Sequence, residues 1–432
     1  DCPQNLREEE MFEVPEWAAN KVVYQIFPSR FAATEPVDKE LWYKAPITPM
    51  DDLHGNLRGI IEHMDDIQNL GIDVLYMTPI FQSNSCHKYD TTDYYQIDPS
   101  FGTTEDLKEL VQKAHERGMK VVLDAVYNHT GREFFAFADI LENGEKSKYR
   151  DWYFIDGFPL KSEWGEIPNF KCFGYYGGMP KLNLKNPEVE KYITDVACYW
   201  IKECDIDGWR LDVGDEISHF FWKNFRKAVK AVKKDMLIIG EIWHYAGDFL
   251  EGDEWDTVMN YPFYLNLIDL LADEKITVSQ FVQNLGYLKG RLHKNCYPLM
   301  WNLIDSHDTA RFLHLCNDNK KKQHLAAAFQ LLLPGMPMIY YGDEYAMPGA
   351  NDPDCRRGMY WDEEYQDKEM YEWYKRLIQV RKSHACIVEG ELAGSVTEDE
   401  EGTVVLIRKN GEETIAMIFN CSSSAKKFNE YT

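Results

Sequence analysis

Short apolar runs alternate with amphipathic stretches over most of the chain. Apolar residues at 57, 60, 61, 64, 67 and 70 recur with the period of a helix, so we predict one helix over 56–70 that ends at Gly71. The sequence Thr103-Thr104-Glu105-Asp106 is typical of a capping box and predicts a second helix that continues to Arg117. The apolar runs beside these helices have the length of buried strands and lie at 22–27, 74–77 and 121–124.

This alternation stops at Thr130 and resumes near Leu184. The intervening segment is rich in Gly, Pro and aromatic residues, and a connection of this length is usually functional or a small domain of its own. Asn186 and Pro187 then begin a predicted helix, as N-cap and first helical residue. Further predicted strands lie at 208–212, 237–241, 257–260, 299–304 and 338–341, and further helices at 220–234, 278–291, 322–333 and 371–384.

Eight strand–helix units favour a closed barrel over an open sheet. After about Ala385 the pattern changes to short strand-like runs at 403–408 and 414–419. We therefore predict an α/β protein with a (β/α)8 TIM barrel made of residues 1–129 and 185–385. A small domain, residues 130–184, is inserted after strand 3, and residues 386–432 form a C-terminal antiparallel β domain whose sheet we expect to be incomplete.

Charge and hydropathy narrow the class of partner. The chain carries 47 Lys and Arg against 72 Asp and Glu, a formal charge of −25, which disfavours nucleic acid and suits a neutral substrate. The longest apolar candidate for a membrane span, around 329–341, is interrupted by Pro334, Gly335 and Pro337. We therefore expect neither a nucleic-acid nor a membrane partner.

The N-terminus and the cysteines bear on the compartment. The chain starts at Asp1-Cys2 without Met or an apolar leader, which we interpret as a processed or excised end that leaves secretion open. None of the ten Cys has the spacing of zinc ligands. Free thiols favour a reducing compartment, so the expected location is cytoplasmic.

Charged side chains gather where several predicted strands end. In a barrel of this kind the chemistry takes place at the carboxyl ends of the strands, so these side chains should converge. Burying carboxylates without partners is costly, which makes a purely structural role a poor explanation for several of them. The residues are Asp124, Arg210, Asp212, Glu241 and Asp308.

Such a cluster fits more than one chemistry. Glycoside hydrolysis needs one carboxylate to attack the sugar and a second, kept protonated, to donate to the leaving oxygen. A metal hydrolase is the physical alternative, because Asp, Glu and His also bind divalent ions. A binding-only barrel remains open on spacing alone. A phosphate-handling barrel is less favoured, because no Gly-rich phosphate loop follows the predicted strands seven and eight.

Four short segments, in order along the chain, resemble the four motifs of the α-amylase family. Each motif alone is short, but four in order on the expected strands are specific, and residues 335–344 at strand eight resemble the family as well. The resemblance covers nearly the whole chain. The segments are Asp124–His129, Gly208–Asp212, Gly240–Trp243 and Ser306–Asp308.

The resemblance implies a role for each motif residue. Asp212 resembles the nucleophile, Glu241 the acid/base and Asp308 the third catalytic carboxylate. Arg210 would keep Asp212 ionised, while burial and neighbouring carboxylates would raise the pKa of Glu241. The resemblance further implies that Tyr89 stacks on the reacting glucose, that His129 and His307 bind its hydroxyls, and that Trp243 lines the aglycone side. His87 lies in the segment that resembles the family's strand-two loop.

The segment Met179–Asn183 resembles a motif of the neopullulanase and cyclomaltodextrinase branch. That branch implies a retaining, endo-type hydrolase of α-1,4-glucosidic bonds in cyclodextrins, pullulan and maltooligosaccharides, with some transglycosylation. The partner is then an α-glucan oligosaccharide. The alternatives are a general α-amylase or α-glucosidase acting on starch, and a catalytically inactive glycan-binding barrel.

Two departures from the family bear on metal and assembly. Glu216 stands where α-amylases with the shared calcium carry His, and residues 29–34 lack the oxygen ligands of the branch's other calcium loop. Asn128 is thus left as a lone candidate for a structural Ca²⁺, and no cofactor is expected to be required. The branch's N-terminal β domain, which helps form its dimer, is missing, so we expect a monomer or a weak homodimer.

Overall fold

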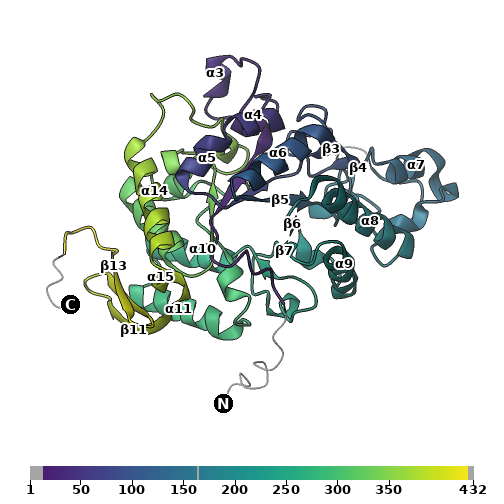
Figure 1. Ribbon diagram of the computed structural model, residues 1–432. Coiled ribbons are helices and arrows are strands. Elements are labelled where there is room, and N and C mark those ends of the chain that lie inside the picture. Colours follow the sequence, from purple (N-terminus) through teal and green to yellow (C-terminus); the bar gives the residue numbers. More distant parts are fainter. Residues whose placement is uncertain (1–12, 163–164, 427–432) are drawn as a thin grey trace.

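Eight parallel strands form a nearly closed barrel in the computed structural model, which describes residues 13–162 and 165–426 (Figure 1). The strand order is β8-β7-β6-β5-β2-β1-β10-β9. The two ends of this order meet at a parallel bridge between Met259 and Trp301, where Asn260 N also donates to Trp301 O at 2.8 Å. The strands are β1 (Val23–Ile26), β2 (Val74–Met77), β5 (Lys120–Ala125), β6 (Gly208–Leu211), β7 (Leu237–Gly240), β8 (Thr257–Val258), β9 (Trp301–Leu303) and β10 (Met336–Tyr340).

Nearly every barrel-strand residue is buried, because side chains fill the interior and helices cover the outside. One apolar cluster, which includes Val23, Tyr76 and Trp301, is separate from the larger core that packs against the helices. The helices are α2 (Pro28–Phe31), α3 (Lys39–Trp42), α4 (Leu57–Glu62), α5 (Met64–Leu70), α6 (Thr104–Glu116), α8 (Pro187–Cys204), α9 (His219–Val232), α10 (Tyr261–Leu267), α11 (Val278–Arg291), α12 (Phe312–Leu315), α13 (Lys320–Leu332), α14 (Lys368–Ser383) and α15 (Cys386–Glu389).

Local signals in the sequence set several of these bounds. The Thr103 side chain caps α6 in a capping box with Asp106, as predicted, and Asn186 caps α8 with Pro187 as its first residue. The helix predicted over 56–70 is wrong in one respect, because it is divided into α4 and α5 at His63. The hairpin of β3 (Phe81–Ser83) and β4 (Thr91–Ile97) was not predicted, because its polar residues mask the strand pattern.

Residues 130–184 contain little regular structure. They hold α7 (Phe135–Asn143), short 3-10 turns and several isolated antiparallel bridges, and α7 extends away from the barrel (Figure 1). Aromatic rings give the segment its own core, in which Phe137 contacts both Tyr153 and Phe170. We propose that residues 130–184 form a separate small domain, as their composition indicates.

The C-terminal part is an antiparallel sheet of β11 (Glu391–Glu398), β12 (Thr403–Asn410) and β13 (Glu413–Asn420). It lies beside α11 and α15 (Figure 1), and Phe419 stacks on Phe329 of α13 at 4.1 Å between ring centroids. We propose that the C-terminal β domain begins at residue 386. The outer ends of the predicted domains, residues 1–12 and 427–432, lie outside the described residues. No helix within 13–162 or 165–426 is both long and apolar enough to cross a bilayer.

The close packing at the end of β7 is open to test by substitution. A Cβ at Gly240 would overlap the Trp255 indole, which is fully buried, so Gly240→Ala should lower the free energy of unfolding by about 1–3 kcal/mol. Gly286 in α11 is the control: nothing lies near its would-be Cβ, so Gly286→Ala should raise stability by up to about 1 kcal/mol. Urea unfolding measures both, and equal effects of the two substitutions would contradict the packing.

Candidate active site

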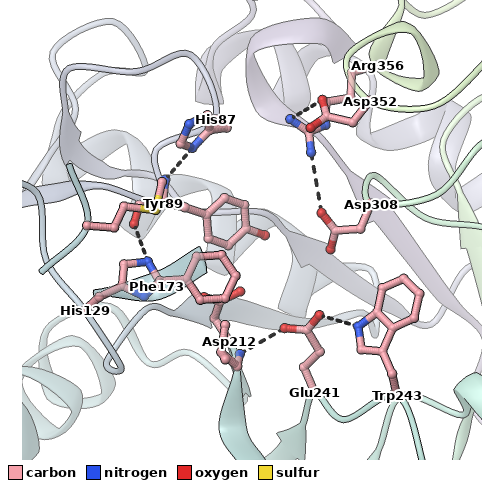
Figure 2. Close-up of a pocket in the computed structure, with 12 residues that line it drawn as sticks. His87, Tyr89, His129, Phe173, Asp212, Glu241, Trp243, Asp308, Asp352 and Arg356 are labelled. Carbon is pink, nitrogen blue, oxygen red and sulfur yellow. Dashed lines mark hydrogen bonds and ion pairs between the residues drawn. The ribbon is translucent and has the colours of Figure 1, made fainter. Parts of the chain in front are cut away.

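A cavity of about 420 Å³ opens at the carboxyl ends of the barrel strands. Asp212, Glu241 and Asp308 face it from three different strand ends, and Tyr89 and Trp243 also line it (Figure 2). Arg210 and His307 lie buried beside it, and Asn128 is buried next to His129. The complete lining is His87, Tyr89, His129, Phe173, Met179, Asp212, Val213, Glu241, Trp243, Asp308, Asp352 and Arg356.

The buried Arg210 guanidinium is the centre of the site. Its Nη1 donates to both oxygens of Asp124 at 3.1 Å and to Asp212 Oδ1 at 2.9 Å. Its Nη2 forms an ion pair with Glu241 Oε2 at 2.9 Å and lies 4.0 Å from Asp308 Oδ2. One cation thus faces the three predicted catalytic carboxylates and a fourth, Asp124, which lies near the end of β5.

Burial and mutual repulsion shift the pKa values of these carboxyls. Burial raises the pKa of Asp124 to about 6, against the opposing charge of Arg210. Burial and then the charge of Glu241 raise the pKa of Asp212 well above its usual range, again opposed by Arg210. One cation thus faces several carboxyl groups whose titrations are coupled.

The Glu241 carboxylate is held by donors on both oxygens. Val213 N donates to Oε2 at 2.9 Å, and Trp243 Nε1 donates to Oε1 at 3.1 Å (Figure 2). The Trp243 ring stacks on Tyr261 with centroids 3.9 Å apart, and it remains 41% exposed. The indole therefore fixes the orientation of the carboxylate and presents a face toward solvent.

The partly buried Tyr89 and the buried His307 form a second hydrogen-bonded group at the cavity. The Tyr89 hydroxyl donates to Asp124 Oδ2 at 2.9 Å and lies 2.6 Å from His307 Nε2. His307 Nε2 is also 3.2 Å from Asp308 Oδ2, and Gln25 Nε2 contacts His307 Nδ1 at 2.7 Å. Burial, then the charges of Arg356 and Arg210, lower the pKa of His307 well below its usual value, so the imidazole is neutral.

His129 and His87 hold the loop that carries Tyr89. His129 Nε2 lies 3.0 Å from the Tyr89 carbonyl oxygen, and Tyr89 N donates to His87 Nδ1 at 3.0 Å. The His129 ring stacks on Phe173 with centroids 5.1 Å apart. Burial lowers the pKa of His129 to about 3, so its imidazole is neutral as well.

Sequence reasoning missed several residues that line the cavity. Arg356 forms an ion pair with Asp352 at 2.8 Å, and its Nη2 is 3.4 Å from Asp308 Oδ1 (Figure 2). Phe173 comes from the inserted segment. These residues lie in long aperiodic segments, where no strand end indicates their position, so the sequence held no local signal for them.

Asn128 does not face the cavity. Its carboxamide oxygen accepts a hydrogen bond from Lys181 Nζ, and its Nδ2 donates to Glu216 Oε2 at 3.2 Å. Within the described part of the chain, no three His, Cys, Asp or Glu side chains are grouped as metal ligands. The candidate calcium ligand is thus engaged with an ammonium group.

Comparison with known proteins identifies relatives. The family model described as "Alpha amylase, catalytic domain" matches residues 25–390. A cyclomaltodextrinase of Geobacillus thermopakistaniensis is 46% identical over 98% of this chain and 72% of its own length. A cyclomaltodextrinase of Thermoanaerobacter pseudethanolicus is 49% identical over 88% of this chain and 66% of its own length. Neopullulanase 2 of Thermoactinomyces vulgaris is 42% identical over 96% of this chain and 72% of its own length.

Solved structures that are similar to this chain include proteins of the same kind as these relatives. A cyclomaltodextrinase structure superposes with a TM-score of 0.91 at 42% identity, covering 95% of this chain and 71% of that one. The ligand-free cyclic α-maltosyl-(1→6)-maltose hydrolase from Arthrobacter globiformis superposes with a TM-score of 0.89 at 38% identity. This second match covers 94% of this chain and 91% of that chain, so the two chains share almost their whole length.

The neutral His129 predicts a pH dependence of stability. Its folded pKa of about 3 lies below the unfolded value of about 6.5, so the unfolded chain binds a proton that the folded chain does not. Stability is therefore lost as pH falls through about 6.5. When the pH falls from 7 to 5, the free energy of unfolding should decrease by about 2 kcal/mol less in His129→Asn than in the parent chain. The exposed Gln68, which has no titratable group, is the control: Gln68→Asn should lose as much as the parent. Identical losses in all three proteins, measured by urea unfolding, would contradict a neutral, buried His129.

Proposed function

This chain belongs to the α-amylase family of glycoside hydrolases, and we propose that it hydrolyses α-1,4-glucosidic bonds in cyclodextrins, pullulan and maltooligosaccharides with retention of configuration. The observation that carries the proposal is the set of carboxylates gathered around Arg210 at the floor of the cavity. The identity to cyclomaltodextrinases and a neopullulanase supports the substrate class.

Substrate binding is proposed to use the neutral groups of the cavity. A glucose unit lies over Asp212 and against the Tyr89 ring, and His87, His129 and His307 bind its hydroxyls. Neutral imidazoles suit this role, because each can donate or accept a hydrogen bond without placing a second cation beside Arg210. Asp308 then holds the distorted ring through its hydroxyls, with Arg356 supporting the carboxylate.

The first chemical step needs one free carboxylate and one protonated carboxyl. Asp212 attacks the anomeric carbon while Glu241 donates its proton to the leaving oxygen, which gives a β-linked glycosyl-enzyme. Arg210 Nη1 donates to Asp212 Oδ1, and this contact favours the ionised form of the nucleophile. Asp124 supports this arrangement, because it holds Arg210 Nη1 from the other side.

The second step returns the enzyme to its starting state. Glu241, now a carboxylate, takes a proton from water, and the water oxygen opens the glycosyl-enzyme with a second inversion at the anomeric carbon. A sugar hydroxyl in place of water gives transglycosylation. The exposed face of Trp243, which also bonds Glu241, is placed to bind an acceptor sugar on the aglycone side.

A second candidate activity is cleavage of α-1,6 links. The observation behind it is the likeness to the cyclic α-maltosyl-(1→6)-maltose hydrolase, whose substrate contains α-1,6 links, and which this chain matches over nearly its whole length. An inactive glycan-binding barrel is less well supported, because every predicted catalytic carboxylate lines the cavity.

Location and assembly are proposed as follows. We propose a cytoplasmic location, supported by the nine cysteines of the described residues, none of which is paired in a disulfide. We propose a monomer or a weak homodimer as the working assembly.

Substrate specificity is tested by parallel digestion of β-cyclodextrin, pullulan and soluble starch. We expect β-cyclodextrin to be opened fastest and pullulan to yield panose. Asp212→Asn should lower kcat by about 10⁴-fold or more, whereas the exposed Asp253→Asn should leave it unchanged. Full activity of Asp212→Asn would remove the nucleophile assignment, and cleavage confined to α-1,6 links would favour the second candidate.

Stereochemistry is an independent test of the mechanism. Two successive inversions should release the α-anomer first, and proton NMR during the first minutes of cyclodextrin digestion detects it before mutarotation. Initial release of the β-anomer would show direct attack by water, and Asp212 would then act as a base.

A further inference from the structure

Lys181 is a charged residue of the Met179–Asn183 segment that no proposed catalytic step uses. Its backbone is fixed at the seam between the inserted segment and the barrel, because Lys181 forms an antiparallel bridge with His129. Leu182 N donates to Asn128 O at 3.0 Å, and Thr130 N donates to Pro180 O at 3.1 Å. The side chain therefore starts directly beside the predicted calcium ligand.

The Lys181 ammonium is surrounded by oxygens from two separate parts of the chain. Its Nζ donates to the Asn128 carboxamide oxygen, to the Glu216 carbonyl oxygen at 3.0 Å and to Glu216 Oε2 at 3.2 Å. The Lys181 side chain is only 19% exposed. A carboxamide, a carbonyl and a carboxylate oxygen are the ligand types that Ca²⁺ takes in proteins.

These contacts fall on the two positions that the family resemblance links to calcium. Asn128 is the lone candidate ligand, and Glu216 stands at the position where the calcium-binding members carry His. A calcium ion needs six to eight oxygens at about 2.3–2.6 Å, and the ammonium lies where such an ion would contact both residues. The residues present therefore do not fit a bound calcium ion.

We propose that the Lys181 ammonium takes the place of a structural calcium ion and joins the inserted segment to the loop that follows the nucleophile. The cation is supplied by the chain itself, so the seam needs no metal. This assigns a physical role to the Lys of the Met179–Asn183 segment.

The joined loop also positions the catalytic carboxylates, and this part of the inference rests on the proposed function. Glu216 ends the 3-10 turn η4 (Gly214–Glu216), which begins two residues after Asp212. At the start of the same loop, Val213 N donates to Glu241 Oε2, and Gly214 N donates to Glu241 O at 3.2 Å. Lys181 is thus a positioning residue that acts through the loop and touches neither substrate nor reacting atoms.

An ordinary surface ion pair is the competing explanation. The Glu216 side chain is 45% exposed, and an exposed Lys–Glu pair contributes little to stability. The buried Asn128 and the Glu216 carbonyl distinguish the two cases, because both would lose their bond to the ammonium when it is removed. Removal of the ammonium should therefore cost more than removal of a neighbouring exposed lysine.

The parent chain provides the first test. Its purified form should contain no stoichiometric calcium by atomic emission, and neither EDTA nor millimolar CaCl₂ should change its Tm. One bound calcium per chain, or a Tm lowered by several degrees in EDTA, would overturn the proposal. This measurement depends on neither a variant nor the catalytic assignment.

Two substitutions test the role of the charge. Lys181→Met keeps the length of the side chain and should lower Tm by about 2–4 °C, with kcat reduced on the order of 10-fold and KM little changed. Lys171→Met, in the same segment but exposed, is the control and should match the parent in both. Lys181→Asp adds a carboxylate beside Asn128 and Glu216, so CaCl₂ should raise its Tm and EDTA should reverse the rise.

The outcomes separate this proposal from the proposed function. If Lys181→Met matches Lys171→Met in Tm and kcat, or if calcium leaves the Tm of Lys181→Asp unchanged, the ammonium does not replace a cation. If the parent chain degrades no glucan while the Tm results hold, the proposed function fails and the structural role of Lys181 stands.

Discussion

The site depends on one buried guanidinium that faces several carboxylates. Arg210 carries one positive charge but is paired with three carboxyl groups. If all three were ionised, the buried cluster would carry excess negative charge, so it must either retain protons or be destabilised. The proposed double-displacement mechanism would use this imbalance, because it needs one carboxyl that can lose its proton and one that can keep it. Removal of Arg210 would leave the carboxylates uncompensated in the barrel, so stability and catalysis depend on the same side chain.

The barrel strands explain how residues so far apart in the sequence meet at this cation. Each strand is short and parallel to its neighbours, so the strand ends bring Asp124, Arg210 and Glu241 to one rim. The helices behind the strands bury the rim on its outer side. The inserted segment, which follows β5, closes the rim at a further point through Phe173. The low dielectric that shifts the pKa values is thus a product of the whole barrel.

The sequence predicted the parts of the molecule that are periodic or that end a strand. β2 and α11 have the predicted bounds, and Asp212, Glu241 and Asp308 line one cavity as expected. The division of a helix at His63 had no local signal, because the apolar period continues across it. Arg356 was not predicted, because an aperiodic loop brings it to the cavity and only the folded chain shows where that loop ends. The engagement of Asn128 by Lys181 likewise depends on a contact between distant segments.

Trp255 lies between Gly214, which follows Asp212, and Gly240, which precedes Glu241. Its indole fills the space that side chains at Gly214 and Gly240 would occupy, and its other neighbours, Phe249 and Trp222, are themselves buried rings. Positions 214, 240 and 255 are therefore epistatic: which residue is tolerated at one is decided by the occupants of the other two. Single substitutions at 214 and 240 will therefore be poorly tolerated, whereas combined libraries with a smaller residue at 255 would accept larger side chains at both positions.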